Sequence, residues 1–320
     1  MKIGMRKNNL EVLRGGINTT FQDLGRENLY HIGIPFSGAM DKRNYLIVNS
    51  LVGNKKNTPV IEFAYQGPLL KVNGEKICFA ISGDVIFNII SKDGKTKKGI
   101  CYKTYLLEED EKIDVLSTNK TVYGYLAING GFDINMFWNS FSINTKAQIG
   151  PNNGKKLNKG DRITIFKPST NFSNKEINHV NNKIEQIRVI RGTNYNYFSE
   201  EGKNFFFNKE FIVSKLSDRM GMRLEGPKIE NIVDTNIKSE GLIKGVIQVP
   251  ADGNPIVMLS DHGTIGGYPK IGVVITADYD KLVQLTPGSK IKFKEISLFE
   301  AENLYKLYCM ETQNIINRIR

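Results

Sequence analysis

The stretches "LNKGDRITIF", residues 157–166, and "LTPGSKIKF", residues 285–293, share the pattern Leu-x-x-Gly-x-x-Ile. In each, a turn centred on glycine is followed by alternating polar and β-branched or aromatic side chains, which is typical of a β-strand. A last strand of this kind can close a small barrel by covering its open edge. The two stretches therefore predict two β domains in one chain, each ending with such a strand.

Further short segments recur in the same order in both halves of the chain. The pairs are "VLRGG" (12–16) with "VIRGT" (189–193), "SGAMD" (37–41) with "SDRMG" (217–221), and "QGPLL" (66–70) with "EGPKI" (225–229). Ordered repetition indicates duplication. We expect a mainly β protein of two related β-barrel domains: residues 1–175 with an insertion, and residues 184–320 with a C-terminal helix. The polar stretch 167–183 is the predicted linker.

Helical periodicity is confined to a few segments. Residues 39–53, "AMDKRNYLIVNSLVG", place apolar side chains on one stripe and end at Gly53, a residue typical of a helix C-terminus. The C-terminal tail begins with the capping-box pattern Ser-x-x-Glu from Ser297 to Glu300 and continues with apolar residues at helical spacing. These two segments are the predicted long helices.

Composition limits the classes of function. The 320 residues are 40% hydrophobic and 24% charged, with no apolar run near the roughly 20 residues that span a bilayer. The first residues carry no apolar signal core, and the three cysteines are scattered, so we expect a cytoplasmic protein with no bound metal. The net charge of +11 comes from lysines dispersed among asparagines, so neither nucleic acid nor membrane is an expected partner.

Common catalytic motifs are missing, and the chemistry must come from other constellations. Gly-x-Ser-x-Gly, a phosphate-binding loop and His-Glu-x-x-His do not occur. Residues 260–272, "SDHGTIGGYPKIG", combine Asp261 at a strand end with Thr264, Gly266, Gly267 and Tyr268. The backbone amides of such a loop can bind an anion, although a plain turn has the same composition. We interpret the loop as a substrate site with Asp261 as a catalytic candidate.

Arg219 is the second catalytic candidate, in "SDRMGMRLEGP" (217–227). A guanidinium binds a carboxylate or phosphate through two parallel hydrogen bonds. The alternative is an internal ion pair with Asp218 that braces the turn. His31 and His262 both neighbour glycine-rich stretches. Because a lone histidine is more often a structural donor than a catalyst, we favour a structural role for each over a direct one.

Four further residues are substrate-binding candidates. Ser37 and Asp41 precede the first predicted helix, where they either cap it or help its amides bind an anion. Gln248 lies in a predicted strand, and its amide can both donate and accept toward an amide-like substrate. Pro250 begins the rigid turn "PADGNP", which can equally be a simple hairpin.

Eight stretches together resemble the allophanate hydrolase subunit 2 family, also called the biotin-dependent carboxyltransferase family. They follow one another along nearly the whole chain: "TTFQDLGR" (19–26), "GIPFSGAMD" (33–41), "LVGN" (51–54), "GPLL" (67–70), "GYLAINGG" (124–131), "SDRMGMRLEGP" (217–227), "SEGLIKGVIQVPADGNPIVMLSDHGTIGGYPKIG" (239–272) and "QLTPGSKIKF" (284–293). The resemblance implies two cyclophilin-like β-barrel domains, which agrees with the duplication above.

The resemblance also implies function and partners. Stand-alone members resemble the C subunit of an ATP-dependent 5-oxoprolinase, which opens 5-oxoproline to glutamate with a B subunit of related fold and an A subunit. Other members imply two alternatives. One is a carboxyltransferase component that works with biotin carried by a partner, and the other is a KipA-type antagonist of a kinase inhibitor. We take the oxoprolinase component, with ATP used in the complex, as the main hypothesis.

Two departures from the family pattern bear on the site. After the "GYLAINGG" strand the family commonly has a Gly-Ser-Arg-Ser-Thr type run, whereas this chain has Phe141 and Ile143 in place of the arginine and threonine. In the glycine loop Gly263 stands where a glutamine is usual. Because an arginine and a glutamine supply polar contacts, their loss predicts a different substrate or a weaker activity.

Overall fold

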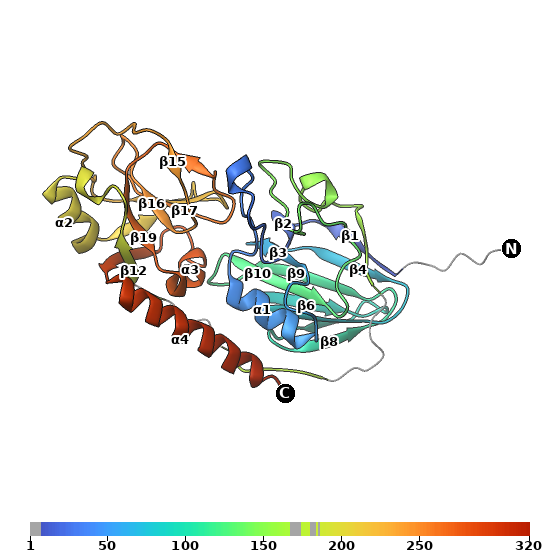
Figure 1. Ribbon diagram of the computed structural model, residues 1–320. Helices are drawn as coiled ribbons and strands as arrows, with labels where there is room; N and C mark the ends of the chain where they lie inside the picture. The colour runs from blue at the N-terminus through green and yellow to red at the C-terminus, as the bar shows by residue number, and fades with distance from the viewer. Residues whose placement is uncertain (1–7, 167–173, 180–183, 185) are drawn as a thin grey trace. The chain divides into compact units, whose positions relative to one another are not determined.

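The computed structural model describes residues 8–166, 174–179, 184 and 186–320 of the chain (Figure 1). The chain divides into two compact units that are interleaved in sequence. One contains Met1–Arg26, Lys42–Asn181 and Gln313–Arg320, and the other contains Glu27–Asp41 and Asn182–Thr312. The predicted linker 167–183 lies mostly outside the described residues, and the predicted domain limits 1–175 and 184–320 remain a prediction.

Two antiparallel sheets build the first unit. The first sheet contains, in order across it, β11 (Arg162–Thr164), β1 (Asn9–Arg14), β4 (Leu69–Asn73), β9 (Lys112–Thr118), β6 (Val85–Ile90) and β7 (Thr96–Lys98). The second sheet contains, in order, β2 (Asn18–Gln22), β3 (Val60–Ala64), β10 (Tyr123–Ile128), β5 (Ile77–Ser82) and β8 (Thr104–Leu107). Alternate residues of both sheets form a single apolar cluster that includes Leu70 and Phe87 of the first sheet and Phe63 and Phe79 of the second.

The connection between β1 and β2 passes from one sheet to the other and requires glycine. A Cβ on Gly15 would lie 2.2 Å from the carbonyl oxygen of Leu157, and one on Gly16 would lie 2.5 Å from that of Gln66. Gly16 also has a φ of 78°, which side chains disfavour. The "VLRGG" stretch is therefore the point at which the chain changes sheets.

The second unit is a closed barrel of seven strands. In order around it they are β12 (Gln186–Arg191), β19 (Lys270–Val274), β16 (Val246–Gln248), β17 (Ile256–Met258), β14 (Gly221–Glu225), β13 (Phe211–Val213) and β20 (Lys290–Glu295). The barrel closes where β20 runs parallel to β12, with Val189 opposite Glu295. The rings of Phe206 and Phe293 stack 4.5 Å apart at buried positions.

The mainly β prediction is confirmed. The strands predicted from the repeated Leu-x-x-Gly-x-x-Ile stretches each lie beside the first strand of their unit. β11 lies beside β1, the first strand of its unit, and β20 lies beside β12. Their directions differ, because β11 is antiparallel to β1 whereas β20 is parallel to β12. The strands of the first unit form two sheets rather than one closed ladder, since the glycine crossover divides β1 from β2.

Both predicted helices are present. α1 (Lys42–Leu51) ends just before Gly53, which has a φ of 73°. α4 (Leu298–Asn317) begins with the predicted capping box, in which the Ser297 amide donates to Glu300 Oε2 over 2.8 Å and the Glu300 amide donates to Ser297 Oγ over 3.2 Å. The expected reciprocal cap is thus confirmed.

Two further helices were missed from the sequence. α2 (Glu200–Asn208) and α3 (Thr276–Val283) have nine and eight residues, so neither shows a sustained helical period. α2 also carries the run "NFFFN", which is typical of a strand, but Ser199 caps it by accepting from the Gly202 amide. The remaining short elements are η1 (Tyr30–Ile32), η2 (Asn152–Gly154), η3 (Tyr195–Tyr197), β15 (Glu240–Gly241) and β18 (Ile265–Gly266).

No helix within the described part of the chain has the length and apolar character needed to cross a membrane.

We expect Phe206→Ala to lower the free energy of unfolding by about 3–5 kcal/mol, because it leaves a cavity beneath α2. Phe206 is fully buried, whereas Phe299 on α4 is 72% exposed, so Phe299→Ala is the matched control and should change stability by less than about 0.5 kcal/mol. Urea unfolding of both variants measures the difference. Equal losses would show that α2 does not cover the barrel core as described.

Candidate functional site

The glycine loop of residues 260–268 lies between β17 and β19 and forms half of a small two-stranded sheet. In this sheet β18 pairs with β15, and Gly266 lies opposite Glu240. The Leu242 amide donates to the carbonyl of Thr264, and the Ile237 amide to that of Gly267, each over 2.9 Å. The loop is therefore fixed by the preceding segment rather than being a bare turn between neighbouring barrel strands.

Arg219 and Asp261, the two catalytic candidates, lie in direct contact. Arg219 Nε donates to Asp261 Oδ2 over 2.8 Å, and Nη2 donates to Oδ1 over 3.1 Å. The two side chains are only 6% and 3% exposed. The backbone joins them as well, since the Asp261 amide donates to the Arg219 carbonyl over 2.9 Å. The pair is a bidentate, buried ion pair between the start of β14 and the glycine loop.

The partner of Arg219 differs from the one considered from the sequence. Asp218 was the proposed brace, but its Oδ1 accepts the amides of Met220 and Gly221 over 2.8 and 3.2 Å, which stabilises the turn itself. Arg219 instead reaches Asp261, 42 residues away along the chain. The idea of an internal ion pair is right in kind, and the choice of carboxylate was wrong because the turn amides satisfy Asp218 locally.

Residues from the N-terminal part of the chain complete this site. Gly38 accepts from Arg219 Nη2 over 2.8 Å, and the Ser37 amide donates to the Ser260 carbonyl over 2.9 Å. Ser37 is fully buried and has a φ of 58°, a conformation that non-glycine residues seldom adopt. Asp41 accepts from the Gln284 side chain over 2.9 Å. The segment Glu27–Asp41 is thus part of the second unit, next to the ion pair.

His262 is buried beside the ion pair, with 1% of its surface exposed. Its Nδ1 lies 2.5 Å from the Gly263 carbonyl, and its Nε2 lies 3.2 Å from the Tyr30 hydroxyl. Burial lowers the pKa of His262, and the ammonium of Lys244 lowers it further, while the Gly263 carbonyl and Asp261 act in the opposite direction. The imidazole is therefore held neutral, with Nδ1–H donating to the carbonyl and Nε2 free to accept from Tyr30.

Gln248 lies under the far end of the loop. Its Nε2 donates to the Tyr268 carbonyl over 3.2 Å, and its side chain is buried at the end of β16. Gly266 packs on it so closely that a Cβ there would lie 2.7 Å from Nε2. Three predicted binding residues, Gln248, Gly266 and Tyr268, are thus brought together. Pro250 accepts from the Gly253 amide in the "PADGNP" turn that follows.

Sequence inspection missed two polar groups next to the loop. Lys270 is buried, and its ammonium donates to Glu240 Oε2 over 2.9 Å, which lowers the pKa of Glu240. The hydroxyl of Ser260 is buried and has no hydrogen-bond partner within the described chain. A lysine directly after "GGYP" and a serine before Asp261 gave no signal, because neither belongs to a recognised spacing.

The first unit holds a separate polar cluster centred on Asp23. This carboxylate is fully buried and accepts from Ser140 Oγ over 2.7 Å, the Phe141 amide over 2.7 Å and Ser142 Oγ over 2.5 Å. Arg26 donates to the Ser142 carbonyl. The Gly25 amide also donates to Asp23 Oδ1 over 2.9 Å, so two hydroxyls and two backbone amides hold this carboxylate.

The family departures in this segment have a structural explanation. Ile143 is fully buried and belongs to the apolar cluster between the two sheets, where an isoleucine stabilises by burial and a threonine would bury a hydroxyl. Phe141 contributes its backbone amide to Asp23, a contact that does not depend on its side chain. The two serines that the chain keeps are the ones that bind Asp23.

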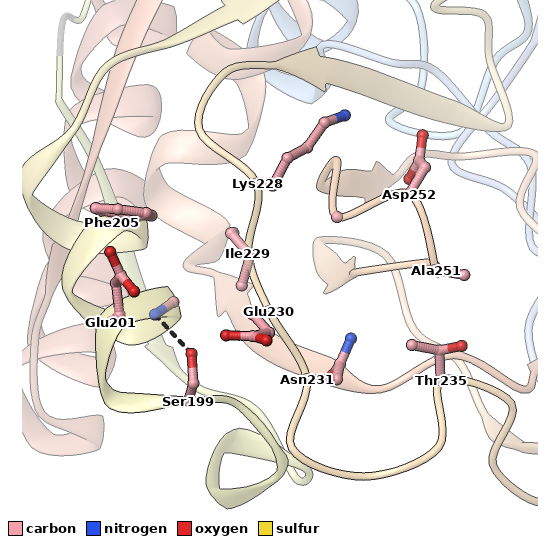
Figure 2. Close-up of a pocket in the computed structure, with 12 residues that line it drawn as sticks. Ser199, Glu201, Phe205, Lys228, Ile229, Glu230, Asn231, Thr235, Ala251 and Asp252 are labelled. Atoms are coloured by element: carbon pink, nitrogen blue, oxygen red, sulfur yellow. Dashed lines mark hydrogen bonds between the residues drawn. The ribbon is translucent and has the colours of Figure 1, made fainter.

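A pocket of about 480 Å³ also lies in the second unit (Figure 2). It is bounded by the start of α2, the segment 228–235 and the turn 251–253, and its lining includes Glu201, Phe205, Lys228, Glu230 and Asp252. None of the predicted site residues lines it. Over the described residues no group of three or more histidines, cysteines and carboxylates could hold a metal ion.

Comparison with known proteins agrees with this architecture. The family described as carboxyltransferase domain, subdomain A and B, matches residues 32–295, and the chain belongs to this family. Two bacterial relatives are each named as the C subunit of 5-oxoprolinase. The one from Haemophilus influenzae is 32% identical over 311 residues, covering 96% of this chain and 99% of that protein. The one from Escherichia coli is 32% identical over 296 residues, covering 91% and 93%.

A solved structure shares the fold of nearly the whole chain. The urea amidolyase of K. lactis superposes with a TM-score of 0.88 and 26% sequence identity, over 98% of this chain. The matched region is 20% of that much longer protein. The mainly β fold implied by the family resemblance is thus confirmed, with one closed barrel in the second unit and two sheets in the first.

We expect Asp261→Ala to lower the free energy of unfolding by about 3–5 kcal/mol, because it leaves the buried Arg219 guanidinium without its counter-ion. Asp218→Ala, which removes only turn hydrogen bonds, should lose about 1 kcal/mol. Replacing both members of the pair by apolar residues, Arg219→Met with Asp261→Leu, should lose less than Asp261→Ala alone. Urea unfolding tests this order, and an Asp261→Ala chain as stable as the native one would contradict it.

Stability should also depend on the protonation of His262. Since its pKa in the folded chain is below 6.5, the unfolded chain binds a proton more readily as the pH falls below that value. The stability present at pH 7.5 is therefore partly lost between about pH 6.5 and 5. In His262→Phe this part of the loss should disappear, and in the control His31→Gln, at an exposed position, it should remain. Thermal unfolding at pH 7.5 and 5.5 measures the effect, and an unchanged loss in His262→Phe would refute the assignment.

Proposed function

We propose that this protein is the C subunit of an ATP-dependent 5-oxoprolinase complex, which opens 5-oxoproline to glutamate together with the A and B subunits. The observation that carries the proposal is the 32% identity to two proteins named as this component of 5-oxoprolinase, over 99% and 93% of their lengths. The complex is a hydrolase acting on a cyclic amide, and we place it in the cytoplasm.

The site around the glycine loop suits a small lactam. 5-Oxoproline has an N–H donor, a carbonyl acceptor and a carboxylate. The Nε2 of Gln248 is directed to the Tyr268 carbonyl, which leaves Oε1 as an acceptor for the substrate N–H. We propose that the loop from Thr264 to Tyr268 binds the substrate's acceptor groups through its backbone, as glycine-rich loops do.

We propose that Arg219 and Asp261 act mainly by positioning. Their ion pair ties the turn before β14 to the loop, and Arg219 also holds the Gly38 carbonyl. Ser37, Asp41 and Pro250 are then supports of the binding loop. A substrate carboxylate can reach the guanidinium only in competition with Asp261. Hydrolysis of a stable lactam needs activation of its carbonyl, and this is the chemistry that ATP supplies in the complex.

A second candidate is a carboxyltransferase component of a biotin-dependent amide carboxylase. The structural match to the K. lactis urea amidolyase favours it. Biotin carries a cyclic urea, so the same loop and Gln248 could bind biotin delivered by a partner. A KipA-type antagonist, the third interpretation, predicts binding to a protein of the B-subunit type without activity.

Reconstitution distinguishes the three. The native chain is mixed with the A and B subunits from the same source, and ATP-dependent glutamate production from 5-oxoproline is measured with each component omitted in turn. We expect activity only in the full mixture. Assembly without 5-oxoprolinase activity would remove the main proposal, and carboxyl transfer from biotin would then support the second.

Within an active complex, Gly266→Ala should reduce kcat/KM by about 10- to 100-fold, because its methyl group would displace the Gln248 amide. The matched control is Gly241→Ala, on the neighbouring strand β15, where an added Cβ meets nothing within 4 Å. The control should keep near-native activity. Equal effects of the two substitutions, or none in Gly266→Ala, would show that Gln248 does not contact the substrate.

A further inference from the structure

A tight turn in the first unit displays three large apolar side chains. Met136, Phe137 and Trp138 are 50%, 43% and 52% exposed, and Trp138 is the only tryptophan of the chain. Around them, the segment 136–145 contains no charged residue, in a chain of which 24% is charged. Adjacent exposed side chains of this size are unusual on a monomer and typical of binding surfaces. We call residues 136–138 the aromatic turn.

The backbone of the aromatic turn is strained. The Phe137 amide donates to the Ser140 carbonyl over 2.9 Å and the Ser140 amide donates back over 3.2 Å, so Trp138 and Asn139 form a two-residue turn. Their φ values are 49° and 57°. Such turns favour asparagine and glycine. A tryptophan in this conformation is rare, because its bulky side chain makes the positive φ unfavourable. Backbone strain of this kind is concentrated at functional positions.

The base of the turn is held rigidly. The buried Asp23 carboxylate binds Ser140, the Phe141 amide and Ser142, the residues that directly follow the turn. These charge-assisted bonds fix the segment to the end of β2. A displayed indole on an already fixed backbone loses little entropy on binding, which is the property of an interface anchor.

We propose that the aromatic turn is an anchor that inserts into an apolar pocket of a partner of the B-subunit type. The proposal rests on the proposed function, in that the relatives are named as one component of several. Two pockets on the chain itself are lined largely by polar and charged residues, such as Lys155 and Lys156 in one and Glu201 and Glu230 in the other. Neither of these two pockets offers an indole a purely apolar lining.

A single fluorine resonance tests the proposal. With 5-fluorotryptophan in this chain only, the ¹⁹F spectrum reports on position 138 alone. Adding the unlabelled B subunit should shift and broaden the resonance. Trp138→Asn, which suits the turn better than tryptophan and so preserves folding, should weaken the interaction by about 30-fold or more in calorimetry. Phe299→Ala, at a more exposed aromatic position on α4, should leave the affinity unchanged.

Each other outcome decides against the anchor. A complex with the B subunit, shown by size-exclusion chromatography, without a change in the resonance would place the interface elsewhere and leave the proposed function standing. A shift caused instead by lipid vesicles, or by raising the concentration of this chain alone, would assign the turn to a membrane or to self-association. Failure of the native chain to bind that partner would overturn the anchor, and the glutamate assay would judge the proposed function separately.

Discussion

The second unit depends on one pairing, the parallel contact between β12 and β20 that closes its barrel. Without it, β12 and β20 would each present unpaired backbone groups, which is the usual weakness of a sheet edge. Closure also fixes the order of the strands in between. β14, β17 and β19, which carry or flank Arg219, Asp261 and the glycine loop, take their positions from that order.

Within this barrel, one buried ion pair holds the segments of the candidate site together. Arg219 meets Asp261 with two hydrogen bonds and reaches Gly38 with another. A buried pair of charges contributes little net stability, because desolvation offsets much of the attraction, but losing one member is costly. Its value lies in geometry, because it makes three distant segments of chain converge. His262, neutral and hydrogen-bonded on both ring nitrogens, extends the same convergence to Tyr30.

The first unit also contains a buried carboxylate, which is held by hydrogen bonds from hydroxyl and amide groups. Asp23 is buried and satisfied by hydroxyl and amide donors from the segment that follows the aromatic turn. The departures at Phe141 and Ile143 leave this arrangement intact, since one contributes a backbone amide and the other packs in the core. The segment therefore keeps its anchoring serines while the arginine of the family pattern is absent.

The sequence by itself determined what is local. The strand-rich pattern, the capping box at Ser297 and the helix end at Gly53 are encoded within a few residues, so they could be predicted and are confirmed. Short helices such as α2 were missed, because nine residues give too little periodicity and tertiary packing decides their state. Several residues of the site were likewise recognisable as types, among them Arg219, Asp261 and Gln248.

Only the tertiary structure decided which of these residues meet. Arg219 finds its carboxylate 42 positions away, although Asp218 is its neighbour, and Asp23 finds Ser142 at a separation of 119. Composition and spacing carry no record of such pairs, because they arise from strand order and crossover positions. The topology also decides whether a polar side chain is exposed and reactive or buried and structural. Burial and hydrogen-bond partners set the charge of the side chain and its freedom to move.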